Sequence, residues 1–280
     1  MFTTQIKNSA IAHTDSGSGE PVVMIHCSSS SAREWQDLCE TLNADFRSFA
    51  ADQWGCGKSD PWGGQVEFTL ASEAEPIVNV IRKIGTPVHL VGHSYGGGVA
   101  LKIVREHPEL VLSLTLIEPS AFHVLAGDPQ DAGLLSEITT LASAVTDAVS
   151  SGNYWEGTAQ FVDYWSGAGT WAAMPYQSQM RLCQTLGKVI LDFRALFNEP
   201  TELRDYANIT CPTLIICGEY ARGPSRRIVE ILADALQRVT LQMIPQAGHM
   251  SPFTHPDQVN SVILDHLYRN SVTDAPVRVA

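Results

Sequence analysis

The first part of the chain alternates between short apolar runs and longer stretches with apolar residues at helical spacing. Continuous apolar runs of this length are typical of strands buried on both faces of a sheet. They predict strands at 21–26, 87–92 and 112–117. The alternation also predicts a strand at 46–51, and apolar residues at helical spacing predict helices at 32–42, 71–84 and 99–107. Two shorter runs, 4–6 and 11–13, predict antiparallel strands at a sheet edge. Because strands and helices alternate, the pattern predicts an α/β fold with a mostly parallel sheet and helices on both of its faces.

The alternation stops near residue 120 and resumes near residue 207. The block between them is helical and irregular in pattern, rich in aromatic residues and interrupted by small ones. After it, the sequence predicts a strand at 212–217, a helix at 226–236, a strand at 240–244 and a last helix at 256–268. We therefore expect an α/β core formed by 1–119 and 207–270, a helical lid formed by 120–206 and inserted after the sixth strand, and a tail at 271–280.

Composition narrows the class of protein. The chain has 280 residues, 44% of them hydrophobic, which suffices for a substantial core. Its formal net charge of −12 disfavours binding to nucleic acid or to anionic membranes. No apolar run approaches the bilayer-spanning length of about 20 residues, and the first ten residues lack the pattern of a secretory signal. The six cysteines form no CxxC pair and have no histidine at zinc-like spacing, which predicts a cytoplasmic protein with reduced, buried thiols and no metal site.

The segment Gly92-His93-Ser94-Tyr95-Gly96 lies between a predicted strand and the helix that follows it. This is the G-x-S-x-G pattern in a strand–turn–helix context, where a serine occupies a tight, strained turn. Side chains at 92 or 96 would collide with neighbouring backbone, so both positions require glycine. The turn exposes the serine oxygen above the sheet and directs the N-terminus of the helix at a reacting carbonyl. The pattern predicts Ser94 as a nucleophile, the alternative being a chance match in a glycine-rich turn.

A serine needs a base to become a useful nucleophile. His249 follows the predicted buried strand 240–244, on a loop from which a neutral imidazole can reach the top of the sheet. We therefore predict His249 as the base, the alternative being a surface histidine. The other histidines are expected in packing or surface positions, with His26 supporting a loop and His93 packing behind the elbow, while His123 could line a pocket.

Five segments resemble the α/β-hydrolase superfamily in order, and the likeness covers nearly the whole chain. They are 15–21 (DSGSGEP), 26–29 (HCSS) in place of the family's HGx loop, 52–59 (DQWGCGKS), the elbow 92–96, and 247–249 (AGH). The resemblance implies a lid-bearing serine hydrolase whose mostly parallel sheet is of the eight-stranded type. It also implies an oxyanion hole formed by the backbone N–H groups of Ser28 and Tyr95, which would stabilise the developing negative charge.

Two positions depart from the family pattern. Cys27 replaces the glycine of the HG pair, either as a thiol at the pocket edge or as a small buried residue. The family's acid usually lies three residues after the glycine that ends the seventh strand, where this chain has Ala221, which cannot orient a histidine. By resemblance to several dehalogenase-like members, we expect the acid to be Glu118 at the end of the sixth strand, held extended by Pro119. Glu219 is the second candidate, and a merely solvated Glu118 is the third interpretation.

The predicted triad of Ser94, His249 and Glu118 indicates a hydrolase without a cofactor that acts on a small apolar carboxylic ester or lactone. Hydrolysis of a carbon–carbon bond in a vinylogous diketone is the first alternative, since the same triad serves it, and a ligand-binding module of low turnover is the second. Part of the lid's aromatic and methionine residues should form the apolar pocket and part the lid core. These residues are Phe161, Tyr164, Trp165, Trp171, Met174 and Tyr176. The sequence leaves the oligomeric state open.

Overall fold

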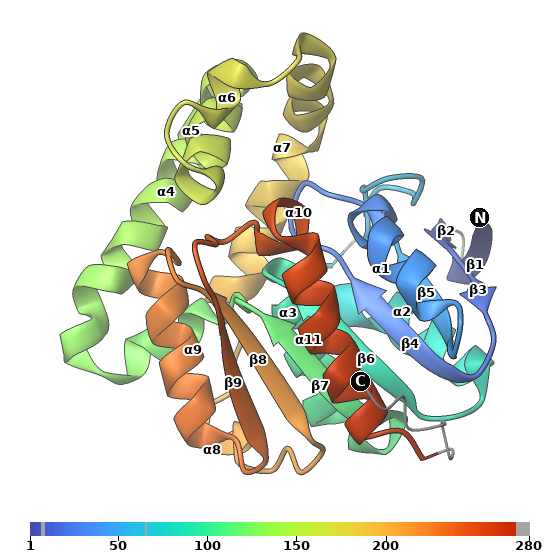
Figure 1. Ribbon diagram of the computed structural model, residues 1–280. Coiled ribbons are helices and arrows are strands. Elements are labelled where there is room, and N and C mark those ends of the chain that lie inside the picture. Colours follow the sequence, from blue (N-terminus) through green and yellow to red (C-terminus); the bar gives the residue numbers. More distant parts are fainter. Residues whose placement is uncertain (7–8, 65, 273–280) are drawn as a thin grey trace.

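The computed structural model describes residues 1–6, 9–64 and 66–272. They form a nine-stranded sheet in the order β1-β2-β5-β4-β6-β7-β8-β9, with β3 pairing with β5 beside that path (Figure 1). The strands are β1 (Phe2–Ile6), β2 (Ser9–His13), β3 (Ser16–Gly17), β4 (Glu20–Ile25), β5 (Phe46–Ala51), β6 (Val88–His93), β7 (Val111–Ile117), β8 (Thr213–Gly218) and β9 (Val239–Ile244). The pairs from β5 to β9 are parallel, whereas β1, β2 and β3 pair antiparallel. The predicted α/β fold with a mostly parallel sheet is thus confirmed.

Burial along the strands follows the apolar pattern in the centre of the sheet and departs from it at one edge. Every residue of β4, β6 and β8 is buried, as their continuous apolar runs predict. In β9 only Ile244 is buried, so the prediction of a buried strand there is wrong. The reason is its place in the sheet, because β9 is the edge strand and pairs only with β8 among the described strands.

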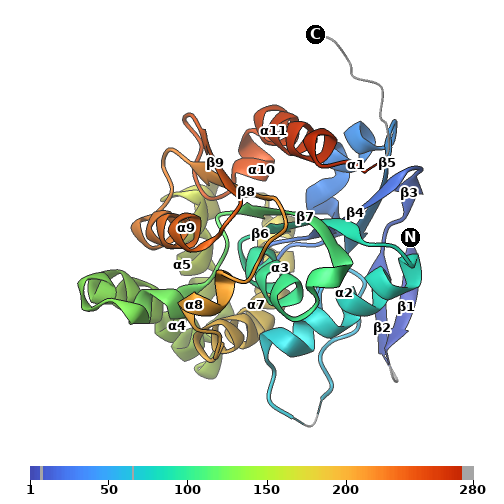
Figure 2. The ribbon, with the colours of Figure 1, turned by 90° about the horizontal axis from the view of Figure 1, so that it is seen from below.

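Helices cover both faces of the sheet, as Figure 2 shows. One face carries α1 (Gln36–Leu42) and α11 (Pro256–Arg269), whose apolar residues pack with β4 and β8. The other face carries α2 (Leu70–Ile84), α3 (Tyr95–Glu106) and α9 (Gly223–Ala235), which share the larger core. The predicted helix 32–42 begins as a 3-10 turn, η1 (Ala32–Trp35), before continuing as α1.

Between β7 and β8 the chain is helical, as its pattern predicts. It forms η3 (Phe122–Gly127), η4 (Pro129–Asp131), α4 (Ala132–Ser150), α5 (Tyr154–Ser166), α6 (Thr170–Ala173), α7 (Tyr176–Phe197) and α8 (Leu203–Tyr206). In Figure 1, α5, α6 and α7 lie beyond the end of the sheet at which β9 leads into α10 (Ser251–Thr254). Of the predicted tail 271–280, residues 273–280 lie outside the described part of the chain.

Candidate active site

Ser94 lies on the turn between β6 and α3 with an unusual backbone, at φ 54° and ψ −118°. The flanking glycines allow this turn. A Cβ atom at Gly92 would lie 2.4 Å from the carbonyl oxygen of Gly96, and one at Gly96 would lie 2.3 Å from the carbonyl oxygen of Ile25. These separations are far below contact distance to backbone that cannot move aside, which explains the glycines of the predicted elbow.

The structure brings the three predicted triad residues together. His249 Nε2 lies 2.9 Å from Ser94 Oγ, and His249 Nδ1 lies 2.8 Å from Glu118 Oε2. The other carboxylate oxygen of Glu118 accepts the Gly218 N–H at 3.0 Å, which fixes the orientation of the carboxylate. All three side chains are buried. The arrangement has the geometry of a nucleophile, a base and an orienting acid.

The backbone of Glu118 differs from the expectation. The prediction that Pro119 holds Glu118 extended is wrong, because Glu118 has φ 38°, in the left-handed region. The chain turns sharply here because the Ser120 N–H donates to the carbonyl of Ser94 at 2.9 Å, directly behind the elbow. Glu219, the second candidate acid, is exposed and accepts the Gln246 N–H at 2.8 Å, at the start of the histidine loop.

The electrostatics of the pair favour a carboxylate and a neutral imidazole. Burial raises the pKa of Glu118, but the hydrogen bond to His249, the charge of His249 and the Gly218 N–H together leave that pKa below the ordinary value. Burial lowers the pKa of His249, and neither its hydrogen bond to Glu118 nor the charge of Glu118 fully reverses this. A neutral His249 whose Nδ1–H donates to Glu118 presents a lone pair on Nε2 to the Ser94 hydroxyl, which is the state that a general base requires.

Ser28 and Tyr95, the predicted oxyanion residues, both lie beside Ser94 in the fold. Tyr95 follows Ser94 at the start of α3, and Ser28 lines the same cavity as Ser94. Within the described residues, neither backbone N–H donates to another protein group. The N–H of Cys27, in contrast, donates to Glu34 Oε2 at 3.0 Å. The role of these two N–H groups in an oxyanion hole stays a prediction.

Cys27 combines the two properties that the sequence left open. Its side chain is buried, and it also lines the cavity. Burial, with the nearby carboxylate of Glu34, raises the pKa of the thiol well above its ordinary value. The thiol is therefore neutral, and its lack of nucleophilic thiolate leaves Ser94 as the better nucleophile in this cavity.

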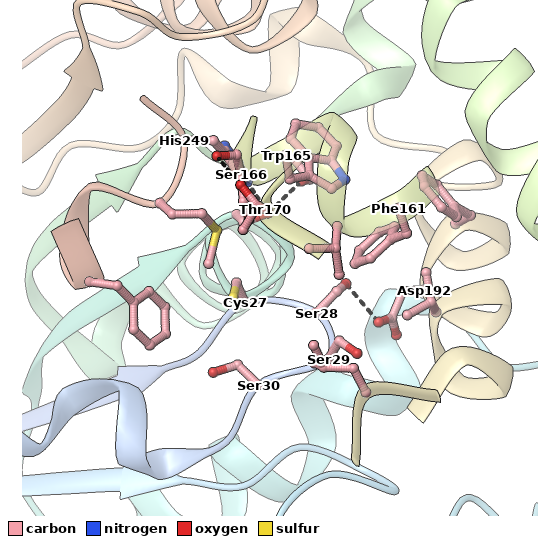
Figure 3. A pocket seen from close by; sticks show the side chains of 18 of the residues that line it. Cys27, Ser28, Ser29, Ser30, Phe161, Trp165, Ser166, Thr170, Asp192 and His249 are labelled. Atoms are coloured by element: carbon pink, nitrogen blue, oxygen red, sulfur yellow. Dashed lines mark hydrogen bonds between the residues drawn. The ribbon is translucent and has the colours of Figure 1, made fainter. Parts of the chain in front are cut away.

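A mostly apolar cavity of about 550 Å³ is lined by Ser94 and His249. Figure 3 shows His249 at its wall. Of the six lid residues predicted to supply it, Phe161, Trp165 and Met174 line it and the other three do not. Trp165 lies against the predicted base, with its ring centroid 4.3 Å from that of His249. His123 does not line the cavity, because its Nε2 pairs with the hydroxyl of Tyr206 at 2.9 Å.

One buried acid at the cavity wall was missed in the sequence. Asp192, on α7, accepts a hydrogen bond from Ser28 Oγ at 2.7 Å, drawn as a dashed line in Figure 3. Its other oxygen pairs with Lys188, one helical turn earlier, which also reaches Glu73 Oε2 at 2.7 Å. The acid–base spacing of 188 and 192 on one helix was the available sequence signal. The network attaches the Ser28 loop to α7 and places one carboxylate beside an apolar cavity.

In the described part of the chain, one group of side chains has its possible metal-ligand atoms close together, within 4.8 Å of one another. This group consists of Cys27, Glu34 and His93. Both oxygens of Glu34 and both ring nitrogens of His93 already have hydrogen-bond partners in the protein. The Cys27 thiol is held in its protonated form because burial raises its pKa. Because metal binding needs deprotonated ligands, these residues do not fit a metal ion.

Among the described residues, no helix is both long enough and apolar enough to cross a lipid bilayer. Residues 20–256 match the family model of the alpha/beta hydrolase fold. The chain is 28% identical over 270 residues to a protein of Variovorax paradoxus named as a carbamate hydrolase, RutD, covering 92% of this chain and 95% of that protein.

A second relative is the 2-hydroxy-6-oxononadienedioate/2-hydroxy-6-oxononatrienedioate hydrolase of a Pseudomonas species, 22% identical over 273 residues, covering 94% of this chain and 93% of that protein. Among solved structures, the fold is similar to that of MGS-M2, an alpha/beta hydrolase enzyme from a Medee basin deep-sea metagenome library. The TM-score is 0.81 at 18% sequence identity, and the match covers 99% of this chain and 100% of that one.

Proposed function

The chain belongs to the alpha/beta hydrolase fold family and is a hydrolase, and we propose that it cleaves a small apolar carboxylic ester or lactone through an acyl-enzyme on Ser94. The observation that carries this proposal is the hydrogen-bonded series Ser94–His249–Glu118 at the wall of an apolar cavity. Each member has the partner that its role needs, and no residue of the series is exposed.

The proposed reaction has two stages. In the first, Ser94 Oγ attacks the substrate carbonyl carbon while His249 Nε2 takes the serine proton, and the N–H groups of Ser28 and Tyr95 hold the oxyanion. The carboxylate of Glu118 stabilises the imidazolium that forms. The tetrahedral intermediate collapses with transfer of the proton from His249 to the leaving alkoxide, which departs as an alcohol from an ester and stays tethered as a hydroxyl group in an opened lactone. In the second stage, His249 deprotonates a water that attacks the acyl carbon. The bond between this carbon and Ser94 Oγ then breaks as His249 returns the proton to Oγ, which releases the acid and regenerates the serine.

The cavity supports an uncharged substrate. Among the described residues that line the cavity, the acidic and basic side chains are those of Asp192 and His249. No Lys or Arg is among these residues. Lys188 pairs with Asp192 and Glu73 rather than lining the cavity. A substrate carboxylate would meet no Lys or Arg among these lining residues, which disfavours it.

The charge of the cavity lining and the ordered base each separate the ester proposal from one of its two alternatives. The Pseudomonas relative is named for a dicarboxylate that it hydrolyses, and the described lining residues of this chain offer no Lys or Arg to pair with such charges. A ligand-binding module would need no ordered base, whereas His249 is held by both Glu118 and Ser94. We therefore favour the ester or lactone over both.

We also propose that the helical block 120–206 acts as a lid. Its helices α5 and α7 supply Phe161, Trp165 and Phe193 to the wall of the cavity onto which the triad opens. Closing the cavity with aromatic rings excludes water and limits substrate size.

Hydrolysis of p-nitrophenyl butyrate tests the proposal. We expect turnover by the native chain and a fall to the residual level of an enzyme without its nucleophile in Ser94→Ala. Ser113→Ala is the matched control, since Ser113 is a buried serine on β7 that lies outside the cavity. Activity of Ser94→Ala above a few per cent of native kcat, or no turnover by the native chain, would contradict the proposal.

A further inference from the structure

A second histidine–carboxylate pair lies beneath the proposed catalytic residues. Glu34, on the 3-10 turn η1, is buried, and its Oε1 lies 2.6 Å from Nδ1 of His93. The other oxygen of Glu34 accepts the N–H of Cys27 at 3.0 Å. Glu34 therefore contacts both the residue that precedes Ser94 and the loop that carries Ser28.

His93 continues this connection to the base. It is the last residue of β6, and its Nε2 lies 2.9 Å from the backbone carbonyl oxygen of His249. A carbonyl oxygen can only accept a hydrogen bond, so Nε2 of His93 carries a proton and donates it. One buried pair thus joins the elbow, the Cys27–Ser28 loop and the loop of His249 through three hydrogen bonds.

The partners of His93 also determine its charge. Nε2 donates to a carbonyl, and Nδ1 faces a carboxylate at short range, so both nitrogens lie against acceptors. Burial lowers the pKa of His93, but the charge and hydrogen bond of Glu34, with the His249 carbonyl, together leave that pKa raised. Burial raises the pKa of Glu34, but the charge and hydrogen bond of His93, with the Cys27 N–H, together leave that pKa lowered. The pair is therefore an imidazolium beside a carboxylate.

This imidazolium lies close to the proposed base, with 5.2 Å between the ring centroids of His93 and His249. The ionisable groups that shift the pKa of His249 are Glu118 after β7, His93 from β6 and Glu34 from η1. Both carboxylates raise that pKa and His93 lowers it, and the influence of His93 exceeds that of Glu34. The pKa of His93 is raised by Glu34, by the His249 carbonyl and by Glu118. The pKa of Glu34 is lowered by His26 as well as by His93.

Resting on the proposed role of His249 as the base, we propose that Glu34 and His93 are positioning residues. They hold the His249 and Cys27–Ser28 loops through hydrogen bonds, and the charge on His93 adds to the effect of burial in keeping His249 unprotonated, and so able to act as a base, at lower pH. Glu118 has the opposite effect on His249, because its carboxylate at Nδ1 stabilises the imidazolium that forms during the reaction.

The protonation states can be measured directly by NMR on the full-length chain with ¹⁵N-labelled histidine. In the native protein, we expect both ring nitrogens of His93 to remain protonated between about pH 5 and 8, and His249 to titrate below its ordinary pKa of 6.5. In His93→Gln, we expect the pKa of His249 to rise by about one unit. The glutamine amide introduced in this variant can still donate to the His249 carbonyl, so a purely structural role of His93 would not produce this rise.

His89→Gln is the matched control, because His89 is also a buried histidine of β6 paired with a carboxylate, with its Nε2 3.0 Å from Glu20 Oε2. It should leave the pKa of His249 unchanged. A neutral His93 at pH 7 in the native protein would overturn the proposal, as would equal shifts in the two variants. The native spectra decide the charge of His93 even where His93→Gln does not fold. Because the titration needs no turnover, an inactive native chain would refute the proposed function while the titration still decides the charge of His93.

Discussion

Replacing Glu118 with Gln removes a charge from the site and preserves the shape of the side chain. The new side chain can keep its oxygen on the Gly218 N–H, which turns its amide group toward Nδ1 of His249. The amide N–H then favours the imidazole tautomer whose Nε2–H faces Ser94, and this tautomer cannot accept the serine proton. The variant also lacks the attraction between the carboxylate and the imidazolium of the transition state.

The size of the effect follows from the geometry. With the carboxylate 2.8 Å from Nδ1, the centres of the two charges lie about 4 Å apart, where an effective dielectric constant of about 20 gives an attraction of about 4 kcal/mol. That value corresponds to a loss of about a thousandfold in kcat. Steady-state kinetics on p-nitrophenyl butyrate measure it, with thermal unfolding as a check on the fold.

The control for this experiment is Glu219→Gln. Glu219 is exposed and accepts the Gln246 N–H, which a glutamine oxygen can also do, so kcat should change by no more than about threefold. The proposed role of Glu118 is refuted if Glu118→Gln keeps more than a tenth of native kcat, or if Glu219→Gln loses as much activity as Glu118→Gln.

Three other predictions concern pH, substrate size and the elbow. Only neutral His249 accepts the serine proton and burial lowers its pKa, so kcat/KM should fall on the acid side with a midpoint below the ordinary pKa of 6.5; a midpoint above that value contradicts the assignment. The cavity of about 550 Å³ should favour p-nitrophenyl butyrate over the palmitate, and equal rates would mean that the lid opens widely. Gly96→Ala places a Cβ 2.3 Å from the Ile25 carbonyl oxygen, so it should destabilise the fold by about 1–3 kcal/mol; an unchanged unfolding temperature would show that the elbow relaxes freely.

The parts of the site that local patterns encode could be predicted from the sequence. The elbow combines a buried strand, two glycines and a helix in one short segment, and the histidine loop follows a recognisable strand. Glu118 could be predicted because the usual acid position holds Ala221 and strand β7 leads into an acid beside β8. Parallel strands that end at one edge of a sheet bring such residues together, and the contact expected between Glu118 and His249 is present.

Features that depend on long-range contacts could not be predicted. Glu34 and His93 are separated by 59 positions, and neither belongs to a motif that indicates contact with the other. Asp192 lies in a helix whose pattern shows only that one face is buried, so its contact with Ser28 required the three-dimensional arrangement. The positive φ of Glu118 arises from the turn behind the elbow, which overrides the local preference of a residue before proline.

The assignment of Ser94 as a nucleophile activated by His249 is tested most directly by reaction with a fluorophosphonate followed by peptide mass mapping. This probe forms a covalent bond to an activated serine whatever the natural substrate is. We expect one adduct, located on Ser94, that forms in the native chain and is lost in His249→Gln. An adduct on another residue, or labelling of Ser94 that is equally fast without His249, would contradict the assignment.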